Sequence, residues 1–142
     1  MNMGNSRNIK FIVVHCADTP EGRNVSTDEI KRWHMEERGW SDIGYHYVIE
    51  LDGKIAEGRS EEVAGAHARG YNTSSIGVCY VGGADKNGNP KDTRTAKQKE
   101  SLEILLEGLL VNYPDAQIVG HRDLDDGKAC PSFDAKTEYE AF

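Results

Sequence analysis

The chain has 142 residues, of which 37% are hydrophobic and 29% are charged, and its formal net charge is -7. This length suits one domain that folds without a disulfide framework, and the acidic charge argues against nucleic acid as a partner. No apolar run approaches the roughly 18 residues of a membrane helix, and the polar N-terminus lacks the apolar centre of a secretory signal. We therefore expect a soluble protein, made in the cytoplasm, without stable membrane association. Its three cysteines suit reduced thiols.

The first expected elements are a buried strand and a helix. Residues 10–16 form an apolar run rich in Ile and Val, which is typical of a strand near the centre of a sheet. Ser26 and Glu29 then form a capping box, and apolar residues follow at helical spacing up to Gly39. These patterns predict a first strand and a first helix.

The remaining elements complete an α/β pattern. Residues 44–58 predict a hairpin with an Asp-Gly turn, and residues 76–83 predict another buried strand. A second capping box, Thr95 to Gln98, begins a leucine-striped helix that ends near Pro114, and residues 116–121 predict the last strand. We expect one α/β domain over residues 1–142, with its core at about 10–134 and a mixed central sheet flanked by helices.

Three side chains of the types that bind zinc lie at or after the ends of predicted strands. His15 and His121 each end a strand-like run, and Cys130 precedes Pro131. Two imidazoles and a thiolate suit zinc, and three protein ligands leave a fourth position open for water. On residue types alone, packed histidines and a buried thiol are the alternative. Cys16 and Cys79 lie within apolar runs and are expected in the core.

Four motifs follow one another along the chain, namely IVVHCADT, WHMEERGWSDIGYHYVIELDG, GAHARGYNTSSIGVCYVGG and VGHRDLDDGKACPSFD. Together they resemble a known family, the zinc-dependent N-acetylmuramoyl-L-alanine amidases of the peptidoglycan recognition protein fold. They extend from about residue 10 to residue 134 and most resemble the small phage amidases called lysozymes. The resemblance implies a zinc-containing groove at strand ends, with His15, His121 and Cys130 as zinc ligands and Tyr45 and Lys128 at the reaction centre.

The implied reaction is hydrolysis of the amide bond between N-acetylmuramic acid and L-alanine in peptidoglycan. Zinc would lower the pKa of a bound water from about 15.7 toward about 7. Lys128 would stabilise negative charge on the substrate carbonyl, and Tyr45 would orient the water or relay a proton. We expect a role in phage or phage-derived lysis, in which the enzyme reaches the cell wall after release or by another export route.

Substrate contacts are expected from four residues around the groove. The resemblance places the loop that contains His67 beside the groove, and a histidine among small residues on a loop is expected to be exposed. His34, Trp40 and Asn72 are further candidates, although packing is the alternative role for His34 and Trp40. Packing is also the alternative for Tyr45, and a solvated surface charge is the alternative for Lys128.

His46 and Arg59 are two further polar residues in this part of the sequence. His46 alternates with Tyr45 and Tyr47 along the expected hairpin, and we assign it to the core. Arg59 is a weaker candidate for the groove.

Three other functions fit parts of the sequence. The related phage amidases also inhibit their own phage RNA polymerase, so a polymerase-binding regulator with secondary or no amidase activity is the main alternative. Its surface would lie in the tail before Lys10 or in the loop of residues 85–92. A non-cutting peptidoglycan receptor is disfavoured because such proteins typically lack the cysteine ligand. A cysteine hydrolase that uses Cys130 with a histidine base is also chemically possible.

Overall fold

A five-stranded mixed sheet forms the centre of the computed structural model, which describes residues 7–142. The order of its strands is β4-β3-β5-β1-β7, and β2 and β6 form a separate two-stranded sheet. The strands are β1 (Phe11–Cys16), β2 (Thr19–Pro20), β3 (Tyr47–Ile49), β4 (Ile55–Glu57), β5 (Ser75–Tyr80), β6 (Gly83–Ala84) and β7 (Gln117–Gly120). The helices are α1 (Thr27–Glu37), the 3-10 turn η1 (Asn72–Ser74), α2 (Ala96–Asn112), α3 (His121–Leu124) and α4 (Ala135–Glu138).

The pairing of the strands confirms the predicted mixed sheet. β1 is parallel to both β5 and β7, β3 is parallel to β5, and β4 is antiparallel to β3. β5 is the middle strand, and β1 lies in the interior of the sheet beside it. Because β1, β5 and β7 run in the same direction, their carboxyl ends lie at one edge. That edge is where His15 and His121 were expected.

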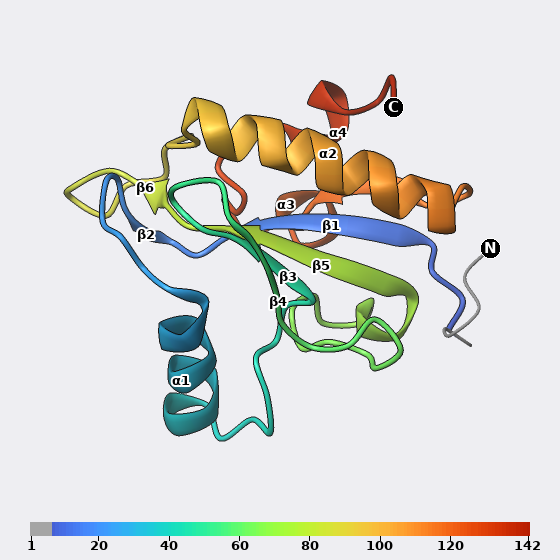
Figure 1. Cartoon of the computed structure of the whole chain (residues 1–142), viewed down its shortest axis with the longest axis horizontal. Helices are drawn as coiled ribbons and strands as arrows, with labels where there is room; N and C mark the ends of the chain where they lie inside the picture. Colours follow the sequence, from blue (N-terminus) through green and yellow to red (C-terminus); the bar gives the residue numbers. More distant parts are fainter. Residues whose placement is uncertain (1–6) are drawn as a thin grey trace.

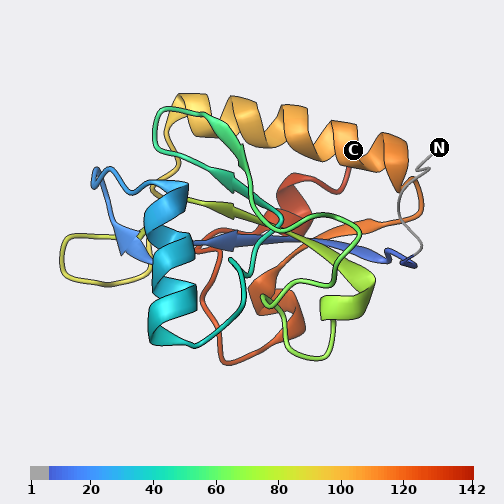
Figure 2. The ribbon, with the colours of Figure 1, turned by 60° about the horizontal axis from the view of Figure 1, so that its bottom comes forward.

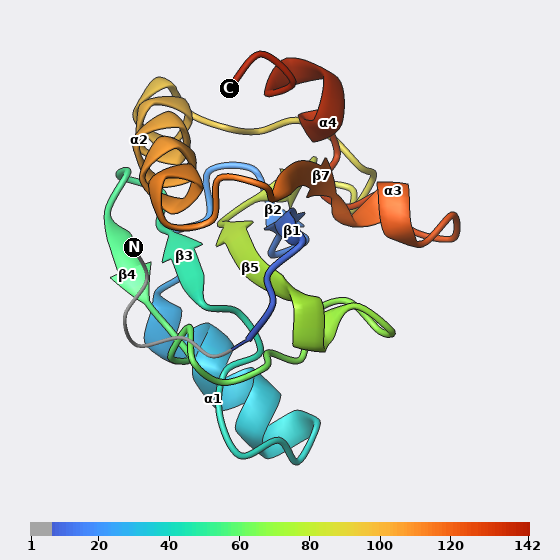
Figure 3. The same ribbon diagram turned by 90° about the vertical axis from the view of Figure 1, so that its right-hand side faces the viewer.

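Helices cover both faces of the sheet, as predicted (Figures 1 and 3). α2 and α4 lie over one face and α1 lies over the other, and the loop between β4 and β5 runs on the same side as α1 (Figure 2). Leu102, Leu106 and Leu109 of α2 are buried in the larger core cluster. Val25 and Ile30 are buried in a second cluster on the side of α1.

Both predicted capping boxes are present. The Ser26 hydroxyl accepts from the Glu29 N–H at 3.1 Å, and the Glu29 carboxylate accepts from the Ser26 N–H at 2.8 Å. The same reciprocal pair of bonds, each 3.0 Å long, joins Thr95 and Gln98 at the start of α2. These bonds satisfy N–H groups that the first turn of a helix leaves open, and they fix where α1 and α2 begin.

Two features were not predicted from the sequence. β2 and β6 pair through Thr19 and Gly83, which are far apart along the chain, and β7 is followed at once by the single-turn helix α3. His121 is therefore the first residue of α3, one position beyond the end of β7. Over residues 7–142, no helix has the length and apolarity needed to cross a membrane.

Candidate metal centre

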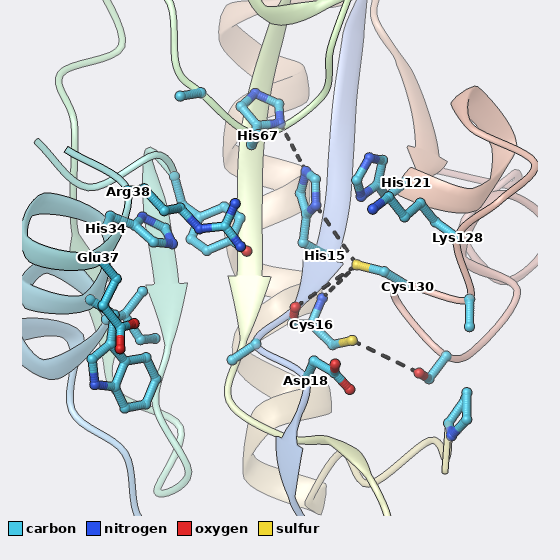
Figure 4. A pocket seen from close by; sticks show the side chains of 18 of the residues that line it. His15, Cys16, Asp18, His34, Glu37, Arg38, His67, His121, Lys128 and Cys130 are labelled. Carbon is cyan, nitrogen blue, oxygen red and sulfur yellow. Dashed lines mark hydrogen bonds between the residues drawn. The ribbon is translucent and has the colours of Figure 1, made fainter. Parts of the chain in front are cut away.

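The structure brings His15, His121 and Cys130 together at the carboxyl edge of the sheet (Figure 4). One nitrogen or sulfur atom of each lies within 4.8 Å of the corresponding atoms of the other two. The parallel register of Val14 with Gly120 sets His15 and His121 side by side, and their ring centroids are 4.6 Å apart. The loop after α3 returns Cys130 to β1, where its Sγ lies 3.7 Å from His15 Nδ1.

The donor atoms fit zinc in chemical type and in spacing. Ligand distances of about 2.1 Å to nitrogen and 2.3 Å to sulfur, at a tetrahedral angle, separate the two donors by about 3.6 Å. The separation of 3.7 Å between Cys130 Sγ and His15 Nδ1 agrees with this value. A zinc ion held by these two nitrogens and one sulfur would have a fourth ligand position available for water.

The protonation of the three side chains also suits metal binding. Burial lowers the pKa of His15 well below its usual range and lowers that of His121, so both rings are neutral near pH 7. The hydrogen bond with the Cys16 thiol, together with burial, raises the pKa of the Cys130 thiol. Cys130 must therefore lose a proton when it binds a metal, and the Cys16 main-chain N–H, 3.1 Å from Sγ, is placed to stabilise the thiolate.

The three donors open into a groove of about 510 Å³. Its walls come from α1, the end of β1, the loops around residues 66 and 88, and the segment from α3 to Ser132. The groove therefore gathers five of the residues singled out from the sequence as catalytic or substrate-binding candidates, namely His34, Trp40, Tyr45, His67 and Lys128.

Tyr45 lies beside His15, and Lys128 lies beside His121. The Tyr45 ring is 5.2 Å from the His15 ring, and burial raises the pKa of its phenol well above the usual range, so the phenol is protonated at neutral pH. Lys128 is exposed, and Figure 4 shows its side chain beside His121. A proton-bearing phenol and an ammonium group thus each lie next to a histidine of the donor cluster.

His34 and Trp40 form part of the wall on the side of α1. Their rings meet edge to face at 4.8 Å, and the Arg38 guanidinium lies 5.2 Å from the Trp40 ring. His34 Nδ1 accepts from the Gly44 N–H at 2.9 Å, and burial lowers the pKa of His34 to about 4. This nitrogen is engaged by the backbone, so a substrate contact of His34 would use Nε2 or the ring face.

Asn72 and Arg59 do not line the groove. The Asn72 side-chain oxygen accepts from the main-chain N–H groups of His67 and Ala68, each at 2.9 Å. The Arg59 guanidinium donates to main-chain carbonyls, including those of Ile43 and Ala64 at 2.9 Å. Both residues hold loops in place. Substrate binding by Asn72 stays a prediction that this placement does not favour.

The expectation that His67 is exposed was wrong. His67 lines the groove, yet it is only 9% exposed, and both of its ring nitrogens are hydrogen bonded, one to His15 and one to Ser75. Its ring fits against Gly77 of β5, which has no side chain to exclude it. His46 is 1% exposed and hence buried, as predicted, and so are Cys16 and Cys79.

Several groove residues were missed in the sequence. Ile30, Trp33, His34 and Glu37 line the groove at the spacing i, i+3, i+4, i+7, which places them on one face of α1. That spacing was a usable signal for Trp33 and Glu37. Asp18 and Arg38 also contribute, just beyond the ends of β1 and α1. The groove thus carries two acidic side chains, Asp18 and Glu37, and two basic ones, Arg38 and Lys128.

A candidate metal site of two histidines and one cysteine, open to a groove with acidic and basic side chains, is the arrangement expected of a metal-dependent hydrolase. Comparison with known proteins agrees with this class and narrows it. The family model described as N-acetylmuramoyl-L-alanine amidase matches residues 5–133. The chain therefore belongs to the N-acetylmuramoyl-L-alanine amidase family. Its activity is hydrolysis of the amide bond between N-acetylmuramic acid and L-alanine in peptidoglycan.

Individual relatives support the same assignment. The endolysin of Klebsiella phage KP32 is 45% identical over 129 residues, which are 91% of this chain and 84% of that protein. The endolysin of Escherichia phage T7 is 46% identical with the same coverage of both chains. Among solved structures, the amidase LysC from Clostridium intestinale aligns with a TM-score of 0.77 and 30% identity over 93% of this chain and 82% of its own. The resemblance inferred from the motifs is confirmed.

Proposed function

We propose that the amidase activity depends on zinc held by His15, His121 and Cys130. The observation that carries this proposal is the convergence of three donor atoms within 4.8 Å of one another at the groove. Zinc, when bound, supplies a Lewis acid and makes a water molecule nucleophilic at neutral pH. The chain contributes the three donors, a groove that positions the substrate, and polar groups that act on the scissile amide.

Lys128 and Tyr45 are the groups that we assign to the amide. The Lys128 ammonium stabilises the negative charge that develops on the carbonyl oxygen of the substrate. The Tyr45 phenol keeps its proton at neutral pH, so it acts as a hydrogen-bond donor that orients the attacking water or the departing amine. The position of Tyr45 beside the His15 ring and that of Lys128 beside His121 support these roles.

The wall on the side of α1 is proposed to bind the substrate. His34 and Trp40 present aromatic surface to the groove, and aromatic rings suit the apolar faces of sugars and peptides. The ionic groups of Glu37 and Arg38 lie on the same wall (Figure 4). A peptidoglycan strand carries both a sugar and a charged peptide, so this wall matches the substrate class.

The similarity to phage endolysins supports a role in lysis of the bacterial wall by a phage. In that role the enzyme is made in the cytoplasm and reaches the wall after release or by another export route. Polymerase binding stays a prediction. Within the proposed polymerase-binding surface, residues 1–6 lie outside the described residues, and Gly88 and Pro90 line the groove.

Digestion of purified sacculi tests the zinc proposal. The enzyme is assayed as purified, after chelation, and after zinc is added back, and the products are analysed by mass spectrometry. We expect free stem peptides that begin with L-alanine, lost on chelation and restored by zinc. Activity that survives chelation but is lost on thiol alkylation would instead support a cysteine hydrolase that uses Cys130.

A further inference from the structure

Behind His15, on the side away from Cys130, lies a series of three hydrogen bonds, of which the first two are buried and the third is partly buried. His15 Nε2 is 2.8 Å from His67 Nδ1, and His67 Nε2 is 3.2 Å from the Ser75 hydroxyl oxygen. The Ser75 hydroxyl in turn lies 2.8 Å from the main-chain carbonyl oxygen of Tyr71. Ser75 is fully buried and His15 is 1% exposed, so these polar groups depend on one another for hydrogen bonds.

The last of these hydrogen bonds fixes which atom donates and which accepts in the other two. A carbonyl oxygen only accepts, so the single hydroxyl proton of Ser75 is donated to Tyr71. The Ser75 oxygen must then accept from Nε2–H of His67. A neutral imidazole carries one ring proton, so His67 Nδ1 is an acceptor and receives Nε2–H of His15. His15 Nδ1 is thereby left without a proton, and this is the nitrogen that faces Cys130 Sγ.

The surroundings hold the His67 ring in this orientation. A Cβ atom placed on Gly77 would lie 2.7 Å from His67 Cγ and Cδ2, and one on Gly65 would lie 2.7 Å from Cδ2. Both glycines are therefore required for the ring to lie where it does. Asn72 fixes the loop from the other end through its two bonds to the main chain at His67 and Ala68.

We propose that Ser75 and His67 are positioning residues that select the tautomer of His15 able to bind the metal through Nδ1. This inference rests on the proposed zinc site. It gives His67 a role different from the substrate contact predicted from the sequence, because both of its ring nitrogens are used within the protein. Partners of this kind behind a ligand raise its basicity and fix its orientation, and their loss typically lowers metal affinity about 10- to 100-fold.

The decisive variant is Ser75→Ala, with Ser74→Ala as its matched control. The Ser74 hydroxyl also bonds to the Tyr71 carbonyl, at 3.3 Å, but Ser74 has no bond to His67. Without the Ser75 oxygen, the His67 proton is no longer held on Nε2. His67 can then donate through Nδ1 to His15, which moves the His15 proton onto the nitrogen meant for the metal.

Two measurements read out this change without an activity assay. Nitrogen-15 NMR of the histidine rings in the metal-free protein reports which His15 nitrogen carries the proton, and competition with a chromophoric chelator reports zinc affinity. We expect an unprotonated Nδ1 in the wild type and in Ser74→Ala, a mixture of tautomers in Ser75→Ala, and a zinc affinity about 10- to 100-fold lower in Ser75→Ala alone.

A second variant covers the case in which Ser75→Ala does not fold. His67→Phe fills nearly the same space without ring nitrogens, and we expect it also to weaken zinc binding. An unprotonated Nδ1 with control-like zinc affinity in Ser75→Ala, or control-like affinity in His67→Phe, would overturn the proposal. Failure of the wild type to bind zinc would refute the proposed function instead, because the His15 tautomer of the metal-free protein is measured independently.

Discussion

Lys128 lies two positions before the candidate ligand Cys130, on an exposed loop that faces the groove. We expect Lys128→Ala to lower kcat about 100- to 1000-fold, because the charge that develops on the substrate carbonyl loses its donor. Bound zinc should be retained, since the ammonium is not a ligand. Steady-state kinetics on a purified muropeptide, combined with metal analysis, check both expectations.

The matched control for this variant is Lys99→Ala, which removes an exposed lysine from α2, outside the set of groove-lining residues. Its kcat should equal that of the wild type. A parallel loss of zinc and activity in Lys128→Ala would assign the lysine to metal retention and would contradict its role at the substrate.

Gly77 shows how one missing side chain supports the metal centre. Gly77→Ala would place a methyl group 2.7 Å from the His67 ring, and the ring is also closely approached at Gly65, so it has little room to move. We expect the free energy of unfolding to fall by about 1–3 kcal/mol, as is typical of overpacked cores. Zinc affinity should fall as well, because the displaced ring no longer orients His15.

Urea unfolding of the metal-free protein, followed by a chelator competition assay, checks both effects. Unchanged stability together with unchanged zinc affinity would show that the His67 ring can shift at little cost. That result would weaken the argument for a rigid partner behind His15.

The burial of His67 illustrates which single-residue features the sequence can predict. The side-chain types of His15, His121 and Cys130 suit zinc, but types alone left packed histidines and a buried thiol as the alternative, and the resemblance to the amidase family singled the three residues out as ligands. The environment of His67, in contrast, depends on Gly77 in the next strand and on Ser75, which meet it only in three dimensions. Its burial was therefore predicted wrongly.

At the scale of elements, α2 offers a test of intrinsic helix stability. Gly108 is exposed in the interior of α2, and a Cβ atom there would meet nothing within 4 Å. We expect Gly108→Ala to raise the free energy of unfolding by about 0.5–1 kcal/mol, because alanine loses less backbone entropy in a helix. Chemical denaturation measures this difference.

The contrasting variant is Gly53→Ala in the β3–β4 hairpin. Gly53 has φ +92°, and a Cβ atom would lie 3.0 Å from Lys97 Cβ. This variant should lower stability, since an L-residue is strained at that angle. The same sign of effect at both positions would contradict this account of the two glycines.

Elements defined by neighbouring residues were predicted well, and elements defined by distant contacts were not. The capping boxes at Ser26 and Thr95 involve residues three positions apart, so the starts of α1 and α2 could be found in the sequence. The β2–β6 pair joins Thr19 to Gly83, and each strand has only two residues. Such short strands carry no periodicity, and only the folded chain reveals them.

At the scale of the whole molecule, buried neutral histidines predict sensitivity to acid. Burial lowers the pKa of His46 to about 4 and that of His67 to about 3, compared with about 6.5 in an unfolded chain. At a pH between the folded-state and unfolded-state pKa values, the unfolded state binds more protons than the folded state. The stabilising contribution of each neutral histidine is therefore fully present above about pH 6.5 and decreases as the pH falls. The loss is about 1.4 kcal/mol per pH unit for each histidine.

Urea unfolding of the metal-free protein between pH 7.5 and pH 5 tests this expectation. The free energy of unfolding should decrease by about 2 kcal/mol per buried histidine at pH 5. Histidine NMR resonances should show no titration of His46 or His67 in the folded protein over this range. A stability that is constant from pH 7.5 to pH 5 would contradict the assignment of both rings as buried and neutral.

The proposed metal would join two parts of the chain that are remote in sequence, since Cys130 lies 115 positions beyond His15. Such a cross-link lowers the conformational entropy of the unfolded chain. In the loop-closure model this stabilises the folded state by about 4–5 kcal/mol. It also sets an order of events during translation. A ribosome must synthesise the chain through Cys130 before the site exists, so no shorter nascent fragment can attack the wall.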